Sequence, residues 1–254
     1  GSAQGSRSAI AWGPVRPRDE VDTRTRADAR RPEGTPGAGE ISLAEEVEAV
    51  TWIWNRIREG SRFPLAEAEG VIRSLGVLLR ALPPGTVPRI RESPLLDYAH
   101  THALHTALLA LGWARDLALP PSEAMGLGLS GLFHDVGLLL ADPDGRHLAH
   151  PGPLDEHGVL AVRSHPTLGA KLLVEAGAPL ALAATVAFEH HMGTGPEAYP
   201  ASGSGRGPHP AARLIQLLST WDALRSTRPH RAALSRDAAL LVLAEGAEEG
   251  WVPV

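Results

Sequence analysis

From residue 42 onward, apolar side chains recur every three or four positions, the spacing that places them on one face of an α-helix. The pattern predicts helices at about 42–60, 64–82, 95–117, 121–135, 154–163, 166–175, 179–191, 210–226 and 235–245. No segment shows a convincing two-residue alternation of the kind that is typical of a β-strand. The sequence therefore predicts an all-α protein, built as a helical bundle.

The same pattern divides the chain into three parts. Residues 1–40 mix Arg, Asp, Pro, Gly, Ser and Thr without apolar periodicity, which predicts a disordered tail or linker. Residues 41–94 hold the first two helices, and we expect a small helical hairpin subdomain there, or a surface for a protein partner. Residues 95–254 form the main domain. Its helix at 95–117 is apolar nearly all round and is predicted to lie at the centre of the bundle.

Composition narrows the chemistry. The chain has no cysteine, which excludes disulfides and thiolate zinc sites and leaves histidine and carboxylate as metal ligands. The formal net charge is −5 and the Lys and Arg residues are scattered, so no surface for duplex nucleic acid is expected. No run of ~20 uncharged apolar residues suggests a membrane span, and no signal-peptide pattern opens the chain. We therefore expect a cytoplasmic protein without a membrane partner.

Histidines supply the candidate chemistry, above all in the stretch Gly131-Leu-Phe-His134-Asp135-Val-Gly137. A histidine beside an aspartate at a helix end is more often an ordinary C-terminal pair than a metal site. Here, however, further histidines fall at or near the ends of other predicted helices, and helix ends in a bundle can converge on one point. The residues in question are His102, His134, Asp135, His165, His190 and His191. Imidazole and carboxylate together favour a site for two metal ions.

These residues belong to a nearly gapless series of motifs. The series runs Asp97-Tyr-Ala-His-Thr-His102, His134-Asp-Val-Gly137, Pro151-Gly-Pro-Leu154, His165-Pro166, His190-His191 before Ala198-Tyr199-Pro200, and Asp222-Ala-Leu-Arg-Ser-Thr-Arg-Pro-His-Arg231. On these motifs, residues 95 to 245 resemble an HD-domain phosphohydrolase of the HD-GYP subfamily, which hydrolyses cyclic dinucleotides such as cyclic di-GMP. The hairpin at 42–82 also resembles the region that precedes the catalytic domain in that subfamily.

The resemblance implies a fold, a reaction and a set of site residues. It implies two divalent metal ions, iron or manganese, bound by His102, His134, Asp135, His165, His190 and His191, with Asp135 as the bridge. His134 and Asp135 would be catalytic in a reaction in which a hydroxide activated by two metals attacks phosphorus. Arg228 and Arg231 would bind the phosphates of the substrate, since a guanidinium fork matches phosphate oxygens. Tyr199 would also contact the substrate. Without the family, a C-terminal helix cap explains the two arginines equally well.

The sequence departs from the family pattern where the chemistry takes place. The aspartate ligand expected three residues before Asp222 is Ser219, and the lysine expected after the His-Asp-Val-Gly motif is Leu138. Position 98, where members with three metals carry glutamate, is tyrosine, so no third metal is expected. In the loop 190–200, the glutamate, aspartate and both glycines of the family's signature are absent.

Two functions are therefore weighed. The first is a metal-dependent phosphodiesterase of the HD-GYP type that acts on a cyclic dinucleotide or another phosphate ester. The second is a catalytically degenerate relative that serves in signalling as a metal-binding, nucleotide-binding or protein-interaction module. With either function, the chain could form a homodimer. The survival of six of the seven core ligands favours the first.

Overall fold

The computed structural model describes residues 43–88, 98–145, 154–193, 198–201, 207–227 and 232–248. The regular elements in these ranges are all helical, which confirms the predicted all-α class. They are α1 (Ala44–Arg58), α2 (Leu65–Arg80), α3 (Tyr98–Asp116), α4 (Pro121–Phe133), α5 (Leu138–Ala141), α6 (Glu156–Arg163), α7 (His165–Ala176), the 3₁₀ helix η2 (Ala178–Leu180), α8 (Ala181–Glu189), α9 (Pro210–Arg225) and α10 (Arg236–Glu248). The predicted tail at 1–40 and the predicted substrate residues Arg228 and Arg231 lie outside the described residues.

Most helix boundaries fall within a few residues of the prediction, and the differences are two short helices. The short helices α5 and η2 were not predicted, because three or four residues are too few to show a periodicity. Helix α1 has Leu43 as its N-cap, without a side-chain cap hydrogen bond. Its first turn instead carries Glu45 and Glu46, whose charges suit the positive end of the helix dipole.

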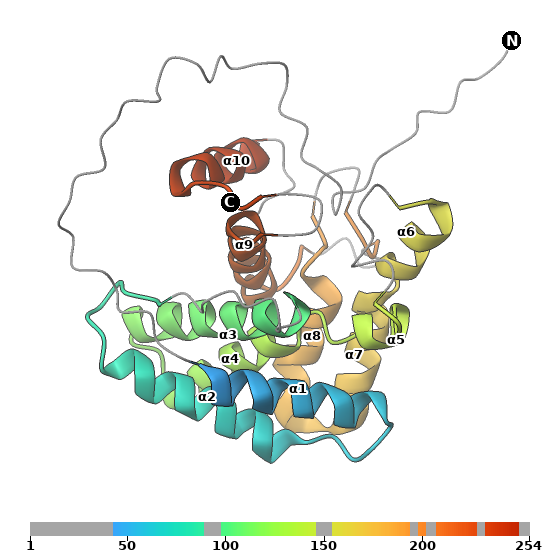
Figure 1. Cartoon of the computed structure of the whole chain (residues 1–254), viewed down its shortest axis with the longest axis horizontal. Helices are drawn as coiled ribbons and strands as arrows, with labels where there is room; N and C mark the ends of the chain where they lie inside the picture. Colours follow the sequence, from blue (N-terminus) through green and yellow to red (C-terminus); the bar gives the residue numbers. More distant parts are fainter. Residues whose placement is uncertain are drawn as a thin grey trace, which may run out of the picture.

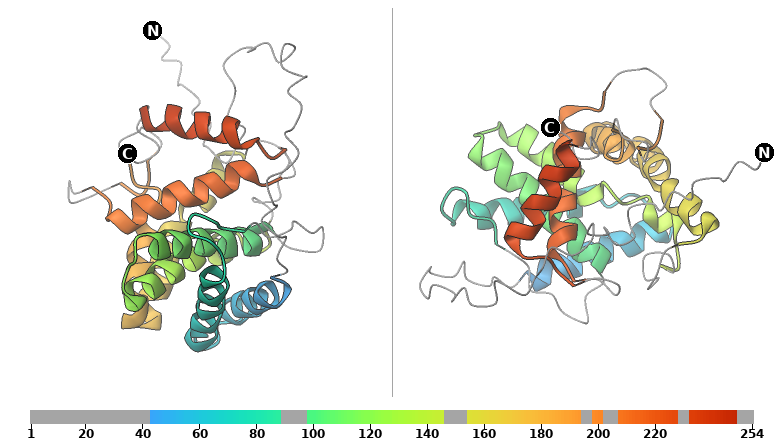
Figure 2. Two further views of the ribbon diagram at one scale, coloured as in Figure 1. Left: turned by 90° about the vertical axis from the view of Figure 1, so that its left-hand side faces the viewer. Right: turned by 90° about the horizontal axis from the view of Figure 1, so that it is seen from above.

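The helices form layers (Figures 1 and 2). Helices α3 and α4 pack against each other in the middle, with α1 and α2 on one side and α9 on the other, and α10 covers α9. Helices α7 and α8 pack together and flank α4 through α8. The residues of α3 from His100 to Leu108 are all buried, which confirms its predicted central position. Its polar residues therefore need partners inside the protein.

One continuous core joins the N-terminal hairpin to the rest of the bundle. Trp54 of α1 and Leu75 of α2 belong to the same buried cluster as Leu104 of α3 and Leu132 of α4. Gly131 lets α3 and α4 approach closely, because a Cβ atom there would lie 2.8 Å from the backbone of Ala107. This close approach brings the end of α4 beside the first turns of α3.

The stretch Pro121–Ala141 is long and apolar enough to cross a membrane by length and composition alone. However, 67% of its most apolar window is buried inside the bundle. Burial of this kind is typical of the core helix of a globular domain, because a helix that faces lipid presents its apolar side chains outward.

Candidate metal centre

The six predicted ligands come from four helices and meet at one place. His102 lies in the second turn of α3, and His134 and Asp135 directly follow α4. His165 is the first residue of α7, while His190 and His191 directly follow α8. Their donor atoms form two groups, and within each group the atoms lie within 4.8 Å of one another: His102, His134 and Asp135 in one, and Asp135, His165, His190 and His191 in the other.

Asp135 belongs to both groups because its two carboxylate oxygens face different histidines. Oδ1 lies 3.2 Å from Nε2 of His165 and 3.2 Å from Nε2 of His190. Oδ2 lies 3.4 Å from Nε2 of His134 and 4.0 Å from Nε2 of His102. Ligand atoms that bind one ion at ~2.0–2.2 Å lie about 3–4 Å from one another. The distances therefore suit a carboxylate placed between two ion sites.

Hydrogen bonds behind the imidazoles fix which nitrogen faces the centre. Carbonyl oxygens can only accept, so the ring Nδ1 that points at each of them carries a proton, and Nε2 of the neutral ring then carries a lone pair. The pairs are His134 Nδ1 with Gly131 O at 2.8 Å, His165 Nδ1 with Val162 O at 2.6 Å, and His190 Nδ1 with Ala187 O at 3.0 Å.

Two of these lone pairs face each other, since Nε2 of His165 and Nε2 of His190 are 3.3 Å apart. Two such acceptors at this distance repel unless a cation lies between or beside them. In addition, Nε2 of His134 is buried and has no hydrogen-bond partner among the described residues. A buried polar atom without a partner is costly, and a metal ion would satisfy it. The donor set therefore fits divalent metal ions.

The ionisation of the centre also suits metal binding. Burial, opposed by Asp135 and reinforced by the neighbouring His190 and His102, lowers the pKa of His134 from 6.5 to about 3. Burial and the nearby His190 likewise lower the pKa of His191. Burial alone would raise the pKa of Asp135, but the imidazoles around it hold that pKa well below its usual value. Neutral imidazoles around an ionised carboxylate are the forms that bind a metal.

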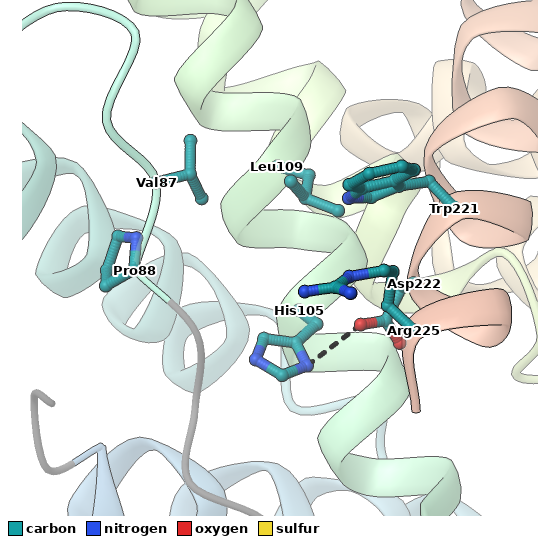
Figure 3. Close-up of a pocket in the computed structure, with 7 residues that line it drawn as sticks. All are labelled: Val87, Pro88, His105, Leu109, Trp221, Asp222 and Arg225. Carbon is teal, nitrogen blue, oxygen red and sulfur yellow. Dashed lines mark ion pairs between the residues drawn. The ribbon is translucent and has the colours of Figure 1, made fainter. Parts of the chain in front are cut away.

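Asp222 and His105 complete the surroundings of His102, and the sequence did not predict either of them as a site residue. The buried carboxylate of Asp222 accepts from His102, with Oδ2 2.7 Å from Nδ1 of that ring. Its other oxygen, Oδ1, lies 3.0 Å from Nδ1 of His105, one turn further along α3 (Figure 3). Asp222 therefore orients His102 rather than joining the centre itself. The His102-x-x-His105 spacing, which puts both rings on one helix face, was the available signal for His105.

The hydrogen bonds to His102 and His105 act on Asp222 in turn. Burial alone would raise the pKa of this carboxyl, but these two bonds hold it below its usual value. Asp222 and His105 also line a pocket of about 150 Å³ (Figure 3). None of the six predicted ligands lines it, so the pocket is separate from the metal centre.

Among the other predicted site residues, Tyr199 lies against the centre. Its ring stacks on that of His191, with centroids 4.6 Å apart and planes 14° apart, and its backbone N–H donates to the carbonyl of His191 at 3.0 Å. Two of the departures from the family pattern, Leu138 and Ser219, supply no ligand or charge to the candidate centre. Leu138 is a buried leucine, and the hydroxyl of Ser219 donates to Gln216 O of its own helix at 3.1 Å.

The fold is an all-α bundle, and its candidate site places five histidines around one shared aspartate. The two features together define a class, the helical proteins with a site for two metal ions. The family model described as HD domain matches residues 90–252. The chain therefore belongs to the HD domain family, and its relatives confirm the predicted HD-GYP type.

The relatives are enzymes of cyclic dinucleotide metabolism by name. A cyclic di-GMP phosphodiesterase of Pseudomonas aeruginosa is 26% identical over 222 residues, which cover 83% of this chain and 53% of the relative. A 3'3'-cGAMP-specific phosphodiesterase of Vibrio cholerae is 28% identical over 187 residues, 73% of this chain and 37% of the relative. A cyclic di-GMP phosphodiesterase response regulator of Xanthomonas campestris is 32% identical over 133 residues, 51% of this chain and 34% of the relative. The chain thus spans about half the length, or less, of these relatives.

Proposed function

We propose that this chain is a metal-dependent phosphodiesterase that hydrolyses a cyclic dinucleotide, cyclic di-GMP or a close relative of it. The observation that carries the proposal is the position of Asp135, with one carboxylate oxygen toward His165 and His190 and the other toward His134 and His102. The names of the relatives support the substrate class.

In this proposal, the two groups of residues hold two divalent ions, iron or manganese. His102, His134 and Asp135 would hold one ion, and Asp135, His165, His190 and His191 would hold the other. When bound, such ions supply Lewis-acid activation of water and of the phosphate ester. The side chains keep neutral Nε2 atoms directed inward, and Asp135 remains ionised between them.

The remaining residues would position the substrate. Tyr199 is proposed to contact the substrate beside His191, on which its ring stacks. Arg228 and Arg231 are proposed to bind phosphate oxygens, on the strength of the family resemblance alone. The missing carboxylate at Ser219 and the missing lysine at Leu138 predict a slower enzyme than a relative with both groups.

The test is hydrolysis by the purified chain, reconstituted with Mn²⁺ or with Fe²⁺ under anaerobic conditions. Cyclic di-GMP and 3'3'-cGAMP are the substrates, and chromatography follows the linear dinucleotide product. His134→Gln should abolish turnover, whereas the matched variant His157→Gln should retain it, because His157 is exposed on α6. A metal-loaded chain that binds both dinucleotides but cleaves neither would favour the degenerate binding module.

A further inference from the structure

A phosphodiesterase needs positive charge for the phosphates of its substrate in addition to that of its metals. Leu138, in the place where the family pattern predicts a lysine, is 4% exposed and carries no charge. Arg163 carries such a charge. Its guanidinium lies over the ring of Tyr199, which in turn stacks on His191 of the candidate centre.

The backbone holds Arg163 close to a predicted ligand. Arg163 is the last residue of α6, and α7 begins two residues later with His165. The corner between the helices is fixed by His165 Nδ1, which donates to Val162 O at 2.6 Å, and by the hydroxyl of Ser164, which donates to Ala161 O at 2.6 Å. The same corner therefore positions a metal ligand and a cation.

The side chain of Arg163 lies over an aromatic ring that itself touches the centre. Its guanidinium carbon is 5.1 Å from the ring centroid of Tyr199. That ring stacks on His191 and meets His165 edge-on, with centroids 6.2 Å apart. A guanidinium over an aromatic ring is held by a cation–π contact, and its N–H groups match phosphate oxygens. The contact with Tyr199 thus places a group that can bind phosphate one ring away from two predicted ligands.

We propose that Arg163 binds a phosphate of the substrate at the edge of the metal centre and that Tyr199 holds Arg163 in place. The inference rests on the proposed function and deepens it. A cyclic dinucleotide carries two phosphodiester groups, so a centre that attacks one of them leaves the other to be bound by the protein. Arg163 supplies the charge for this second phosphate.

The test is binding of cyclic di-GMP to the Mn²⁺-loaded chain by equilibrium dialysis at low temperature, with the integrity of the ligand checked by chromatography afterwards. Arg163→Gln should raise the Kd about 10- to 100-fold, the range for loss of a charge-assisted hydrogen bond. Arg163→Lys should recover part of the affinity, because an ammonium keeps the charge but not the fork. Lys171→Gln, the same charge change at an exposed position of α7, should leave the Kd unchanged.

Arg163 could bind the phosphate directly, or it could only support Tyr199 and His191. Metal content, measured by elemental analysis on each variant, distinguishes these two roles. The proposal expects equal metal content in the Arg163 variants and the parent chain. An unchanged Kd in Arg163→Gln would overturn it, and so would a loss of metal that accounts for the weaker binding, since Arg163 would then only support Tyr199 and His191. If the parent chain itself does not bind cyclic di-GMP, this role of Arg163 is wrong, whereas cleavage of bis(p-nitrophenyl) phosphate still tests the phosphodiesterase chemistry.

Discussion

Four of the five imidazoles of the candidate metal centre have a hydrogen-bond partner behind them. His134, His165 and His190 use backbone carbonyls of their own helices or of the preceding turn, so helix geometry fixes them. His102 instead depends on a side chain far away in the sequence, the carboxylate of Asp222 on α9. Removal of the charge from that one acceptor therefore tests whether the surroundings of a predicted ligand affect metal binding.

Asp222→Asn should weaken metal binding about 10- to 100-fold, the usual effect of losing the partner of a ligating histidine. The amide has nearly the same shape as the carboxylate but no charge to hold the proton on Nδ1 of His102. Titration of the metal-free protein with Mn²⁺ measures the affinity. Asp237→Asn, a change at an exposed position of α10, is the control and should leave the affinity unchanged. Equal affinities in all three proteins would mean that Asp222 does not orient His102.

Ser219→Asp tests the missing carboxylate directly. Ser219 lies one turn before Asp222 on α9, and its hydroxyl bonds only to its own helix among the contacts described. An aspartate there should add an anionic ligand, raising metal affinity and the rate of cyclic di-GMP hydrolysis. Steady-state kinetics on the reconstituted variant give the rate. No change in rate with two metals in place would show that the centre is not limited by this position.

Among the elements, the turn between α4 and α5 holds the site against α7. A Cβ atom on Gly137 would lie 1.9 Å from the carbonyl oxygen of His165 and 2.6 Å from the backbone nitrogen of Gly169. Both are backbone atoms, so they could give way only if α7 moved. The glycine at this position therefore determines how closely His165 approaches Asp135.

Gly137→Ala should destabilise the fold by about 1–3 kcal/mol, the usual cost of overpacking, and should lower metal content by displacing His165. Gly70→Ala provides the opposite case in helix α2, where an added Cβ would meet nothing within 4 Å. That variant should stabilise the fold by about 0.5–1 kcal/mol, because alanine favours a helix more than glycine does. Urea unfolding compares them. Equal effects of the two substitutions would contradict the close contact at Gly137.

The helices also show which features of the fold and of the candidate site could be predicted from the sequence. The long amphipathic helices and the buried α3 were predictable, because their apolar spacing repeats over several turns. The convergence of the six ligand positions was suggested by their places at helix ends and by the family motifs. The roles of Asp222 and Arg163 were not predictable from spacing, since His102 is 120 residues from Asp222 and only the folded chain brings Arg163 onto Tyr199.

For the whole molecule, the buried histidines link stability to pH. The pKa of His134 falls from 6.5 in a free chain to about 3 in the fold, so between these values the unfolded chain binds the extra proton. The free energy of unfolding must then decrease as the pH falls from about 6.5 toward 3. The pKa of His191 is shifted in the same direction. The lowered pKa of Asp135 adds a further loss below about 3.8.

Metal-free protein should therefore lose stability between pH 6.5 and 5, by up to about 1.4 kcal/mol per pH unit for each buried neutral histidine. Urea unfolding in the presence of a chelator, repeated at several pH values, measures the slope. His134→Gln should make the slope shallower, since it removes one of these groups. A free energy of unfolding that stays constant or rises as the pH falls through this range would contradict the buried neutral state.

The most direct measurement is the number of metal ions per chain. Elemental analysis of the purified protein, before and after reconstitution with Fe²⁺ or Mn²⁺, gives the stoichiometry. Two groups that share Asp135 predict about two ions per chain in the parent protein, and a large loss of both in Asp135→Ala. No bound metal after reconstitution, or an equal content in parent and variant, would contradict a two-metal centre at Asp135.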